Sequence, residues 1–487
     1  MDKDEEIEQL FVSLENPDNE IEIVIHVNML KEGWDVSNLY TIVPLRAANA
    51  AVLIEQTIGR GLRLPFGGKR TGEPNIDKLT VIAHDNFDAV IIGGGACGLM
   101  CAVQAGYLGK RTLILEKNEK IGAKILISGG GRCNVTHACF DNKQLAGYYP
   151  RGENYLKKAF DQFNVQSTID WFAERGIPMK TYPDGCLFPE SNDSQTIIDC
   201  FLSEANKRGI HILLNQGIKR IEVVKNGFKL HADQKVFDAT RVIVTTGGQP
   251  KRGNFDWLEQ LGHDIIEPLP SLFTFNMPEN PVRELMGTVV EKASVRVEGT
   301  KLLGQGPLLI THWGMSGPAV LLLSAWGARI LAEKNYHFHV LVNWLHEMKE
   351  AELRQKIELT AHLHGAKKAQ NLNPFHITNR LWQFLLSKAE IPNEIRWQEL
   401  GKKNTNKLVN ILLNDRYEVK GKTTFKEEFV TAGGVSMSNV DIRNMESKRV
   451  PGLHFAGEIL DIDGITGGFN FQAAWTTGFI AGKNCLD

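Results

Sequence analysis

The sequence predicts an α/β protein built around a parallel, nucleotide-binding sheet. A short apolar strand at residues 88–92 runs directly into a G-x-G-x-x-G pattern at residues 93–98, and an apolar helix follows. A second apolar strand at residues 112–115 ends in the acidic residue Glu116. Strand, glycines, helix, second strand and terminal acid in this order are typical of a dinucleotide-binding fold.

Each part of this motif has a physical role. Gly93 permits the tight turn after the strand, Gly95 lets the backbone approach a pyrophosphate, and Gly98 lets the helix pack closely on the strand. The helix that begins at Ala96 offers free N–H groups and a partial positive charge to phosphates. Glu116 is expected to accept hydrogen bonds from ribose hydroxyls.

Further glycine clusters identify the dinucleotide. One occupies residues 122–136, a strand at 242–248 ends in Gly247 and Gly248, and a third cluster spans residues 452–472. Glycine leaves room for the close approach of a large flat ligand and freely adopts positive φ. A nucleotide fold that opens early and is completed by the last strand and helix is the order of two-dinucleotide-type flavoproteins, so the expected cofactor is FAD.

Length and composition exclude several classes of protein. The 487 residues, 43% hydrophobic and 23% charged, predict a folded chain of about three domains. No apolar run reaches the roughly 20 residues of a membrane helix, and the acidic start MDKDEE differs from a secretory signal. The seven cysteines include no C-x-x-C pair, so we expect neither a disulfide framework nor a metal site, and a cytoplasmic location.

The charge balance is uneven along the chain. The net charge is −2, but residues 1–87 contain 8 Lys and Arg against 15 Asp and Glu, and the remainder contains 47 against 42. Neither part has the strongly basic balance of a nucleic-acid-binding domain. The sequence therefore predicts a small-molecule substrate, no nucleic-acid partner and no membrane partner, and leaves the oligomeric state open.

Four segments carry a family resemblance. They are GAKILISGGGRCNVTH at 122–137, THWGMSGPAVL at 311–321, TAGGVSM at 431–437 and AGEILDIDGITGGFNFQAAWTTG at 456–478. From residue 88 onward the chain resembles the bacterial NAD(P)/FAD-dependent oxidoreductases that include aminoacetone oxidase and the bile-acid-inducible N-type flavoprotein. The resemblance implies an FAD-binding domain at residues 88–271 and 422–487, a β-barrel insert at 272–346 and a helical insert at 347–421.

The resemblance also implies cofactor-binding residues. Those expected at the adenosine diphosphate half are Gly93, Gly95, Ala96, Gly98, Glu116 and Lys117. Those expected nearer the ribityl chain and isoalloxazine are Lys124, Ser128, Gly131, Arg132, Cys133, Asn134, Gly247, Gly457, Glu458, Gly467, Gly468, Asn470 and Gln472. For Asn470 and Gln472 a purely structural role, as cap or turn residues, is the alternative.

The expected chemistry is that of the flavin, whose N5 exchanges a hydride with a small organic substrate. The helix begun by Gly467 and Gly468 could direct its N-terminus at negative charge near N1. His312 is the candidate proton donor and Cys133 a candidate activated thiol, each with a structural role as the alternative. The chain has no second G-x-G-x-x-G on a strand, so NAD(P)H bound transiently and O₂ both remain possible redox partners.

The first 87 residues resemble something different. Residues 29–36, 56–63 and 79–85 resemble the end of the second RecA-like lobe of superfamily 2 helicases, especially type III restriction subunits. In that family the arginines matching Arg60 and Arg63 reach a γ-phosphate. The chain contains no G-x-x-x-x-G-K-[ST] loop, so we interpret residues 1–87 as a truncated helicase-lobe fragment, fused to a complete flavoprotein.

Two other functions fit the same residues. One is a nucleic-acid-associated flavoprotein, acting in tRNA modification or beside a helicase. The other is a flavin-binding regulator without turnover.

Overall fold

The chain forms two compact units, residues 1–87 and 88–487. The computed structural model describes residues 41–42, 80–81, 86–233, 235–346, 348–423 and 430–486. Before residue 86 the described residues are the parallel strand pair β1 (Thr41–Ile42) and β2 (Thr80–Val81). The helicase-like segments otherwise lie outside the described residues.

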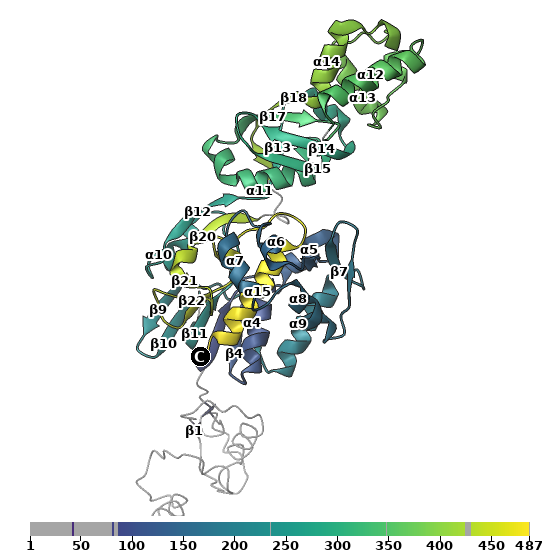
Figure 1. Ribbon diagram of the computed structural model, residues 1–487. Helices are drawn as coiled ribbons and strands as arrows, with labels where there is room; N and C mark the ends of the chain where they lie inside the picture. Colours follow the sequence, from purple (N-terminus) through teal and green to yellow (C-terminus); the bar gives the residue numbers. More distant parts are fainter. Residues whose placement is uncertain are drawn as a thin grey trace, which may run out of the picture. The chain divides into compact units, whose positions relative to one another are not determined.

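A nine-stranded sheet forms the centre of the second unit, in the order β21-β22-β23-β11-β3-β4-β8, with β10 and β9 extending from β11 (Figure 1). Parallel pairs join β3 to β4, β4 to β8 and β11 to β23. The strands are β3 (Asn86–Ile92), β4 (Thr112–Leu115), β8 (His211–Leu213), β9 (Arg220–Val224), β10 (Gly227–His231), β11 (Val236–Val244), β21 (Val440–Asp441), β22 (Glu446–Ser447) and β23 (Leu453–Phe455).

Two long helices from opposite ends of this unit pack together. The helix α4 (Ala96–Tyr107) follows the first strand, and α15 (Phe469–Asn484) lies directly along it (Figure 1). Small residues permit the close approach, since a Cβ on Gly482 would lie 2.2 Å from the carbonyl oxygen of Cys101. The last helix therefore completes the layer that the first helix begins, as expected for a two-dinucleotide-type fold.

Further helices and small sheets complete the nucleotide-binding domain. The helices are α5 (Ala123–Gly131), α6 (Asn142–Ala146), α7 (Glu153–Ala159), α8 (Val165–Ala173), α9 (Gln195–Lys207) and α10 (Asp256–Glu259). A three-stranded sheet contains β5 (Thr136–His137), β7 (Cys186–Pro189) and β6 (Met179–Thr181), and β12 (Ile265–Pro270) pairs with β20 (Thr431–Val435).

The segment between β12 and β20 folds as a barrel. Its seven-stranded sheet has the order β18-β17-β14-β15-β16-β13-β19. The edge strands β18 and β19 are consecutive in the chain and separated only by Gly421, so the two edges meet and the sheet closes. The strands are β13 (Thr274–Asn276), β14 (Val289–Val297), β15 (Leu303–Ile310), β16 (Gly314–Ser316), β17 (His337–Asn343), β18 (Asp415–Lys420) and β19 (Lys422–Thr423), and α11 (Pro318–Glu333) packs on β15.

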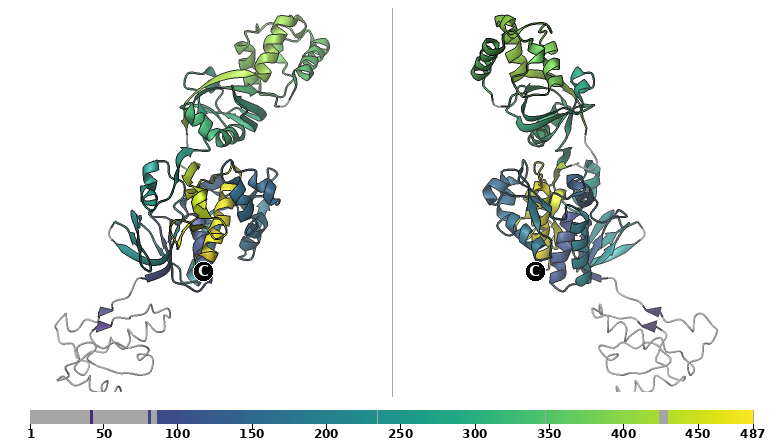
Figure 2. Two further views of the ribbon diagram at one scale, coloured as in Figure 1. Left: turned by 60° about the vertical axis from the view of Figure 1, so that its left-hand side comes forward. Right: turned by 90° about the vertical axis from the view of Figure 1, so that its right-hand side faces the viewer.

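Helices α12 (Glu350–His364), α13 (Asn379–Lys388) and α14 (Gly401–Leu413) come between β17 and β18 in chain order and gather at one end of the barrel (Figure 2). This corrects one expected boundary, because residues 415–420 belong to the barrel and not to the helical insert. Their side chains alternate between buried and exposed, as a strand paired with β17 requires.

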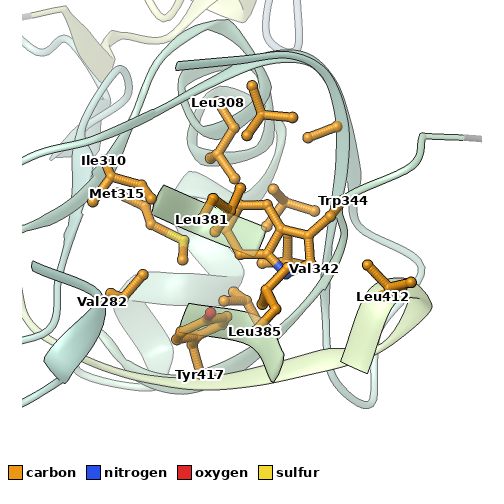
Figure 3. Packing of buried hydrophobic residues seen from close by; sticks show 14 of the residues in the cluster. Val282, Leu308, Ile310, Met315, Val342, Trp344, Leu381, Leu385, Leu412 and Tyr417 are labelled. Carbon is orange, nitrogen blue, oxygen red and sulfur yellow. The ribbon is translucent and has the colours of Figure 1, made fainter. Parts of the chain in front are cut away.

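The barrel and the helical insert share one hydrophobic core. Trp344 and Tyr417 from the barrel side meet Leu381 and Leu385 of α13 and Leu412 of α14 (Figure 3). Beside them the buried carboxylate of Asp415 accepts hydrogen bonds from Trp344 Nε1 at 3.0 Å and from the Tyr417 hydroxyl. The insert is thereby anchored to the barrel from which it emerges.

Leu385→Ala should lower the free energy of unfolding by about 2–5 kcal/mol, because it removes a fully buried side chain and leaves a cavity in this shared core. Urea denaturation of the FAD-bound protein measures the change. Gln383→Ala, at an exposed position of the same helix, is the control and should change stability by less than about 0.5 kcal/mol. Equal effects of both substitutions would contradict the shared core.

Candidate flavin-binding and active site

The turn after β3 depends on close backbone packing. Gly93 has φ +108°, and a Cβ there would lie 2.6 Å from the carbonyl oxygen of Thr245 at the end of β11. A Cβ on Gly98 would lie 1.9 Å from the carbonyl oxygen of Gly93 itself. Both positions therefore require glycine, and the start of α4 is held directly over the strand ends.

The third glycine of the motif faces open space. Gly95 is the N-cap of α4, and a Cβ built on it would meet no atom within 4 Å. No side chain caps this helix, so the first-turn N–H groups of α4 are left for a ligand. An anionic pyrophosphate is the group that such a helix start binds best.

Glu116 closes the same end of the cradle. It follows β4 directly, its Oε2 accepts a hydrogen bond from the Gly94 N–H at 2.7 Å, and its Oε1 accepts one from the Asn118 N–H at 2.9 Å. These bonds fix the carboxylate. Oε1 also accepts a hydrogen bond from Asn118 Nδ2 at 2.6 Å, so Oε2 is the oxygen that retains a lone pair for a ribose hydroxyl.

A cavity of about 860 Å³ joins these groups to the last segment of the chain. Most of the predicted cofactor residues line it: Gly93, Gly95, Ala96, Glu116, Lys117, Lys124, Ser128, Asn134, Gly247, Gly457, Glu458, Gly467, Gly468 and Asn470. The site residues thus come from five separate stretches of the chain, which parallel strand ends and helix starts bring to one edge of the sheet.

The loop before α15 forms one wall of the cavity. Asn470 holds this loop, because its side chain accepts a hydrogen bond from Gly464 N at 2.8 Å and donates one to Gly464 O at 2.9 Å. Gly468, in the left-handed region at φ +92°, begins the helix. In the amide orientation that satisfies both ends, Asn134 accepts a hydrogen bond from Gly468 N at 3.2 Å. The first-turn N–H groups of this 16-residue helix lie beside the cavity.

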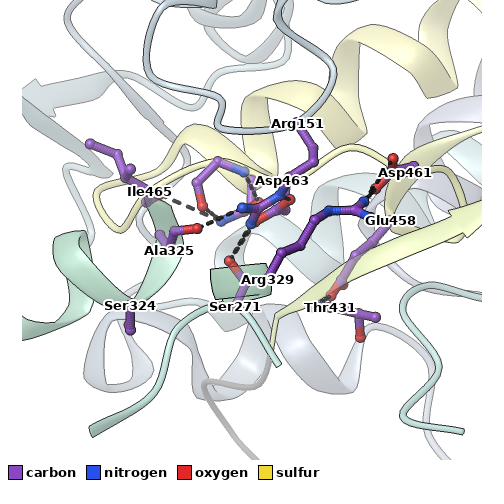
Figure 4. Close-up of polar contacts among 12 residues, drawn as sticks. Arg151, Ser271, Ser324, Ala325, Arg329, Thr431, Glu458, Asp461, Asp463 and Ile465 are labelled. Atoms are coloured by element: carbon purple, nitrogen blue, oxygen red, sulfur yellow. Dashed lines mark hydrogen bonds and ion pairs between the residues drawn. The ribbon is translucent and has the colours of Figure 1, made fainter. Parts of the chain in front are cut away.

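A buried ion pair supports the same loop (Figure 4). Arg151 Nε donates a hydrogen bond to Asp463 Oδ1 at 2.5 Å. Arg151 Nη2 donates to Asp463 Oδ2 and also to Ser271 Oγ, the latter at 2.9 Å. Arg151 Nη1 donates to the carbonyl oxygen of Ala325 in α11 at 2.6 Å. Burial outweighs the attraction of Arg151 and raises the pKa of Asp463 to about 6.

A second charged pair lies in the cavity wall. Lys124 Nζ is 3.1 Å from Glu458 Oε2, and the other oxygen of Glu458 accepts a hydrogen bond from Thr431 N at 2.8 Å. A Cβ on Gly248, in the segment after β11, would lie 2.5 Å from Glu458 Oε1, so glycine leaves room for this carboxylate. Glu458 is thus held in a fixed position at the cavity surface.

Five of the predicted cofactor residues do not line the cavity: Gln472, Arg132, Gly131, Cys133 and Gly98. Gln472 is fully buried, and its amide oxygen accepts hydrogen bonds from Thr136 Oγ1 at 2.6 Å and Thr168 Oγ1 at 3.0 Å, so it has the structural role. Arg132 stacks over the ring of Phe188, 4.4 Å from its centroid. Gly131 likewise does not line the cavity, and its carbonyl oxygen accepts a hydrogen bond from Ser194 N at 2.9 Å.

Cys133 is the fourth of these residues. It is fully buried, and burial raises its pKa to about 12, so it is not an activated thiol. Gly98 also lies outside the lining, in the packing role expected of it.

His312 is not placed as a proton donor. Its ring is exposed on the turn between β15 and β16, where it packs against Trp313 with the centroids 4.2 Å apart. It does not line the cavity. The motif around it instead shapes the turn, since Thr311 N donates to Gly314 O at 2.8 Å.

Sequence reasoning missed the apolar part of the wall. Leu272, Leu321, Val430, Ile462 and Ile465 line the cavity together with Phe471. They come from the ends of inserted segments and from a helix of the barrel, so no local pattern marks them. The only sequence signal was the position of Ile462 and Ile465 inside the glycine-rich C-terminal segment.

The residues present fit FAD. Gly95 leaves the space that a pyrophosphate needs, Glu116 is positioned for a ribose, and the buried Thr246 hydroxyl in the cavity wall has no hydrogen-bond partner among the described residues. In the described part of the chain no group of three or more His, Cys, Asp or Glu side chains could hold a metal ion. No helix among the described residues is long and apolar enough to cross a bilayer.

Gly95→Ala should weaken FAD binding at least about tenfold while leaving the apoprotein folded. Its φ of −78° suits alanine, and the new methyl group would enter only the space reserved for the pyrophosphate. Titration of the apoprotein with FAD, followed by flavin fluorescence, measures the affinity. Gly98→Ala is the comparison, because its methyl group would meet backbone and lower thermal stability as well. Unchanged FAD affinity in Gly95→Ala would refute this placement of the pyrophosphate.

Arg151→Met should destabilise the protein by about 3–5 kcal/mol at pH 8, because it leaves the Asp463 carboxylate buried without its cation. The variant should raise the pKa of Asp463 further. At low pH the Asp463 carboxyl is protonated in both the wild-type protein and the variant. The difference in stability between the two proteins should therefore shrink towards pH 5.5 and grow as the pH rises. Urea denaturation at both pH values tests this.

Arg329→Met is the control for that experiment. It removes an exposed ion pair, Arg329 Nη2 to Asp461 Oδ1 at 3.3 Å, and should cost less than about 1 kcal/mol at either pH. A pH-independent loss in Arg151→Met would show that the ion pair does not support the loop.

Comparisons with known proteins show the family of the chain. The family model described as HI0933-like protein Rossmann domain matches residues 87–484. The ribosomal RNA dihydrouridine synthase of Escherichia coli (strain K12) is 29% identical over 413 residues, 82% of this chain and 98% of that protein. The 3-dehydro-bile acid delta(4,6)-reductase of Clostridium scindens is 28% identical over 405 residues, 81% of this chain and 97% of that protein.

Among solved structures, the 3-ketosteroid delta1-dehydrogenase of Sterolibacterium denitrificans matches with 11% identity and a TM-score of 0.46, over 82% of this chain and 99% of that one. The family match begins where the second unit begins and spans both halves of the nucleotide-binding domain. The chain therefore belongs to the HI0933-like protein Rossmann domain family and is a flavin-dependent oxidoreductase.

Proposed function

We propose that this protein is a reductase of carbon–carbon double bonds conjugated to a carbonyl group, with FAD as cofactor and NAD(P)H as the source of electrons. The observation that carries the proposal is a single cavity that contains the dinucleotide cradle, a helix N-terminus and an apolar wall. The proposal concerns residues 87–484, and the helicase resemblance of the first 87 residues stays a prediction from sequence.

The apolar wall supports a flat, uncharged reacting group. Leu272, Leu321, Ile462 and Ile465 line the same cavity as the glycine loop at 464–468. Apolar side chains with a few placed polar groups are typical of sites for small rings. None of the lining residues within that loop is ionisable, and the charged lining residues, such as Glu116, Lys124 and Glu458, come from other segments of the chain.

The start of α15 supports reduction of a conjugated system. When a hydride adds to the far carbon of a C=C–C=O group, negative charge moves to the carbonyl oxygen, and the near carbon then takes a proton. FAD, when bound, would supply that hydride. The N–H groups at the start of α15 offer a fixed partial positive charge beside the cavity, as developing anions require.

The relatives support the same reaction class. The names of two of them, a dihydrouridine synthase and a delta(4,6)-reductase of a 3-dehydro-bile acid, both describe gain of hydrogen across a ring double bond. Uracil and a 3-oxo-4-ene share the C=C–C=O unit, although the rest of each molecule differs. The common feature is therefore the reacting group.

The test is anaerobic reduction and reoxidation of the bound flavin. NADPH or NADH should bleach the flavin spectrum, and a 3-oxo-4-ene steroid or a uridine-containing ribosomal RNA transcript should restore it with one saturated bond formed per flavin. Reoxidation by O₂ alone would assign an oxidase and refute the proposal. A flavin that no reductant or acceptor changes would assign a non-catalytic flavin-binding protein.

Two variants of α11 test whether the apolar wall contacts the substrate. Leu321→Trp should raise KM for the accepted substrate about tenfold or more, with FAD retained, because the larger side chain enters the cavity. Leu322→Trp, at the neighbouring position of α11 outside the lining, should leave KM within about twofold. Equal KM values would exclude this wall from the substrate site.

A further inference from the structure

The last helix of the chain begins at two glycines, whose backbone needs support from other residues. Gly467 has φ +118°, and Gly468, the N-cap of α15, has φ +92°. Glycine has more conformational freedom to lose than any other residue, so contacts from elsewhere must hold such a turn in one conformation. Asn470 is hydrogen-bonded to Gly464. Asn134 accepts a hydrogen bond from Gly468 N. The carbonyl group of Gly467 needs a partner of its own.

His137 is that partner. It is the last residue of β5, and its Nδ1 is 3.1 Å from the carbonyl oxygen of Gly467. A carbonyl oxygen only accepts hydrogen bonds, so this contact requires the proton on Nδ1. The backbone of β5 also approaches the helix start, because a Cβ on Gly468 would lie 2.6 Å from the carbonyl oxygen of Thr136. The imidazole therefore lies directly beside the turn.

Ring contacts hold the imidazole in place. It stacks on Phe469, the first residue of α15, with the ring centroids 4.6 Å apart and an angle of 26° between the planes. The ring centroid of Tyr148 is 4.6 Å from that of Phe469 and 6.3 Å from that of His137. Gly185 leaves room for the imidazole, since a Cβ there would lie 2.5 Å from His137 Nε2. His137 thus contacts the residue before the N-cap by a hydrogen bond and the residue after it by stacking.

These contacts lie next to the cavity and not inside it. Gly467 and Gly468 line the cavity. His137, Phe469 and Tyr148 do not line it. The imidazole therefore acts on a ligand only through the turn, by fixing the direction of the first N–H groups of α15. Donors that are already oriented stabilise a developing negative charge without reorganisation, whereas a turn of two unsupported glycines would have to be ordered during the reaction.

We propose that His137 is a positioning residue for hydride transfer, because its hydrogen bond to Gly467 holds the N-terminus of α15 in the orientation that stabilises negative charge. The inference rests on the proposed function for the group that becomes anionic, the carbonyl oxygen of a conjugated substrate. The same N-terminus would favour the negative charge of reduced FAD in the cavity. The reduction potential of bound FAD therefore reports on the turn in the absence of any substrate.

Two substitutions separate the hydrogen bond from the ring. His137→Phe keeps an aromatic ring against Phe469 but removes the donor, and His137→Asn removes the ring but places an amide N–H near the position of Nδ1. For reduction of a small 3-oxo-4-ene by NADPH, His137→Phe should lower kcat at least about tenfold and leave KM within about threefold, because the lost stabilisation grows only as charge develops. The midpoint potential of bound FAD, measured by anaerobic titration with a redox dye, should become more negative. His137→Asn should keep kcat within about threefold of the wild-type value and leave the potential unchanged.

Further variants provide the controls. His312→Phe makes the same change at an exposed histidine outside the cavity and should alter neither kcat nor the potential. His137→Leu also lacks the donor and should show the same losses as His137→Phe, so the test does not depend on one variant. Thermal denaturation shows whether each variant is folded.

The outcomes separate this inference from the proposed function. Unchanged kcat and potential in the variants without the donor, or equal losses in His137→Phe and His137→Asn, would overturn the positioning role. If no conjugated substrate is reduced, the proposed function fails and the potential still tests the inference. A potential that becomes more negative in His137→Phe and His137→Leu, but not in His137→Asn or His312→Phe, would then support it.

Discussion

The buried ion pair between Arg151 and Asp463 determines how the site is assembled. One guanidinium joins the loop before α15, the start of the inserted segment at Ser271 and helix α11 of the barrel. Bringing both charges out of water is expensive, and the raised pKa of Asp463 reflects that cost. A hydrophobic pair could pack there, but it could not accept and donate the hydrogen bonds that fix three chain segments around one point.

The cofactor cradle depends on glycines, which have no side chain. At Gly93, Gly98 and Gly248 the backbone or a fixed carboxylate occupies the place of a Cβ, so only glycine allows the elements to meet. At Gly95 the same absence leaves space for a ligand. This difference explains why the motif was readable in the sequence: geometry imposes the residue type locally, within a few positions of one strand and one helix.

Other parts of the structure depend on contacts that no local pattern records. The family resemblance predicted a barrel, but its closure comes from β18 and β19 lying on either side of Gly421, and the alternation at 415–420 was assigned to the helical insert instead. Gln472 stands in a glycine-rich motif that suggested cofactor contact, yet partners more than 300 positions away bury it. Arg151 and the apolar wall residues were not predicted, because their roles arise only when distant segments meet.

The charge of the protein is unevenly distributed along the chain. The charge balance of the two parts of the chain, 8 Lys and Arg against 15 Asp and Glu in residues 1–87 and 47 against 42 in the remainder, predicts no nucleic-acid partner, and this stays a prediction. Here acidic residues prevail in the first 87 positions and basic residues in the second half of the helical insert. The cavity shows the same separation within one site, because charged groups such as Glu116 and the Lys124–Glu458 pair share its lining with an apolar wall.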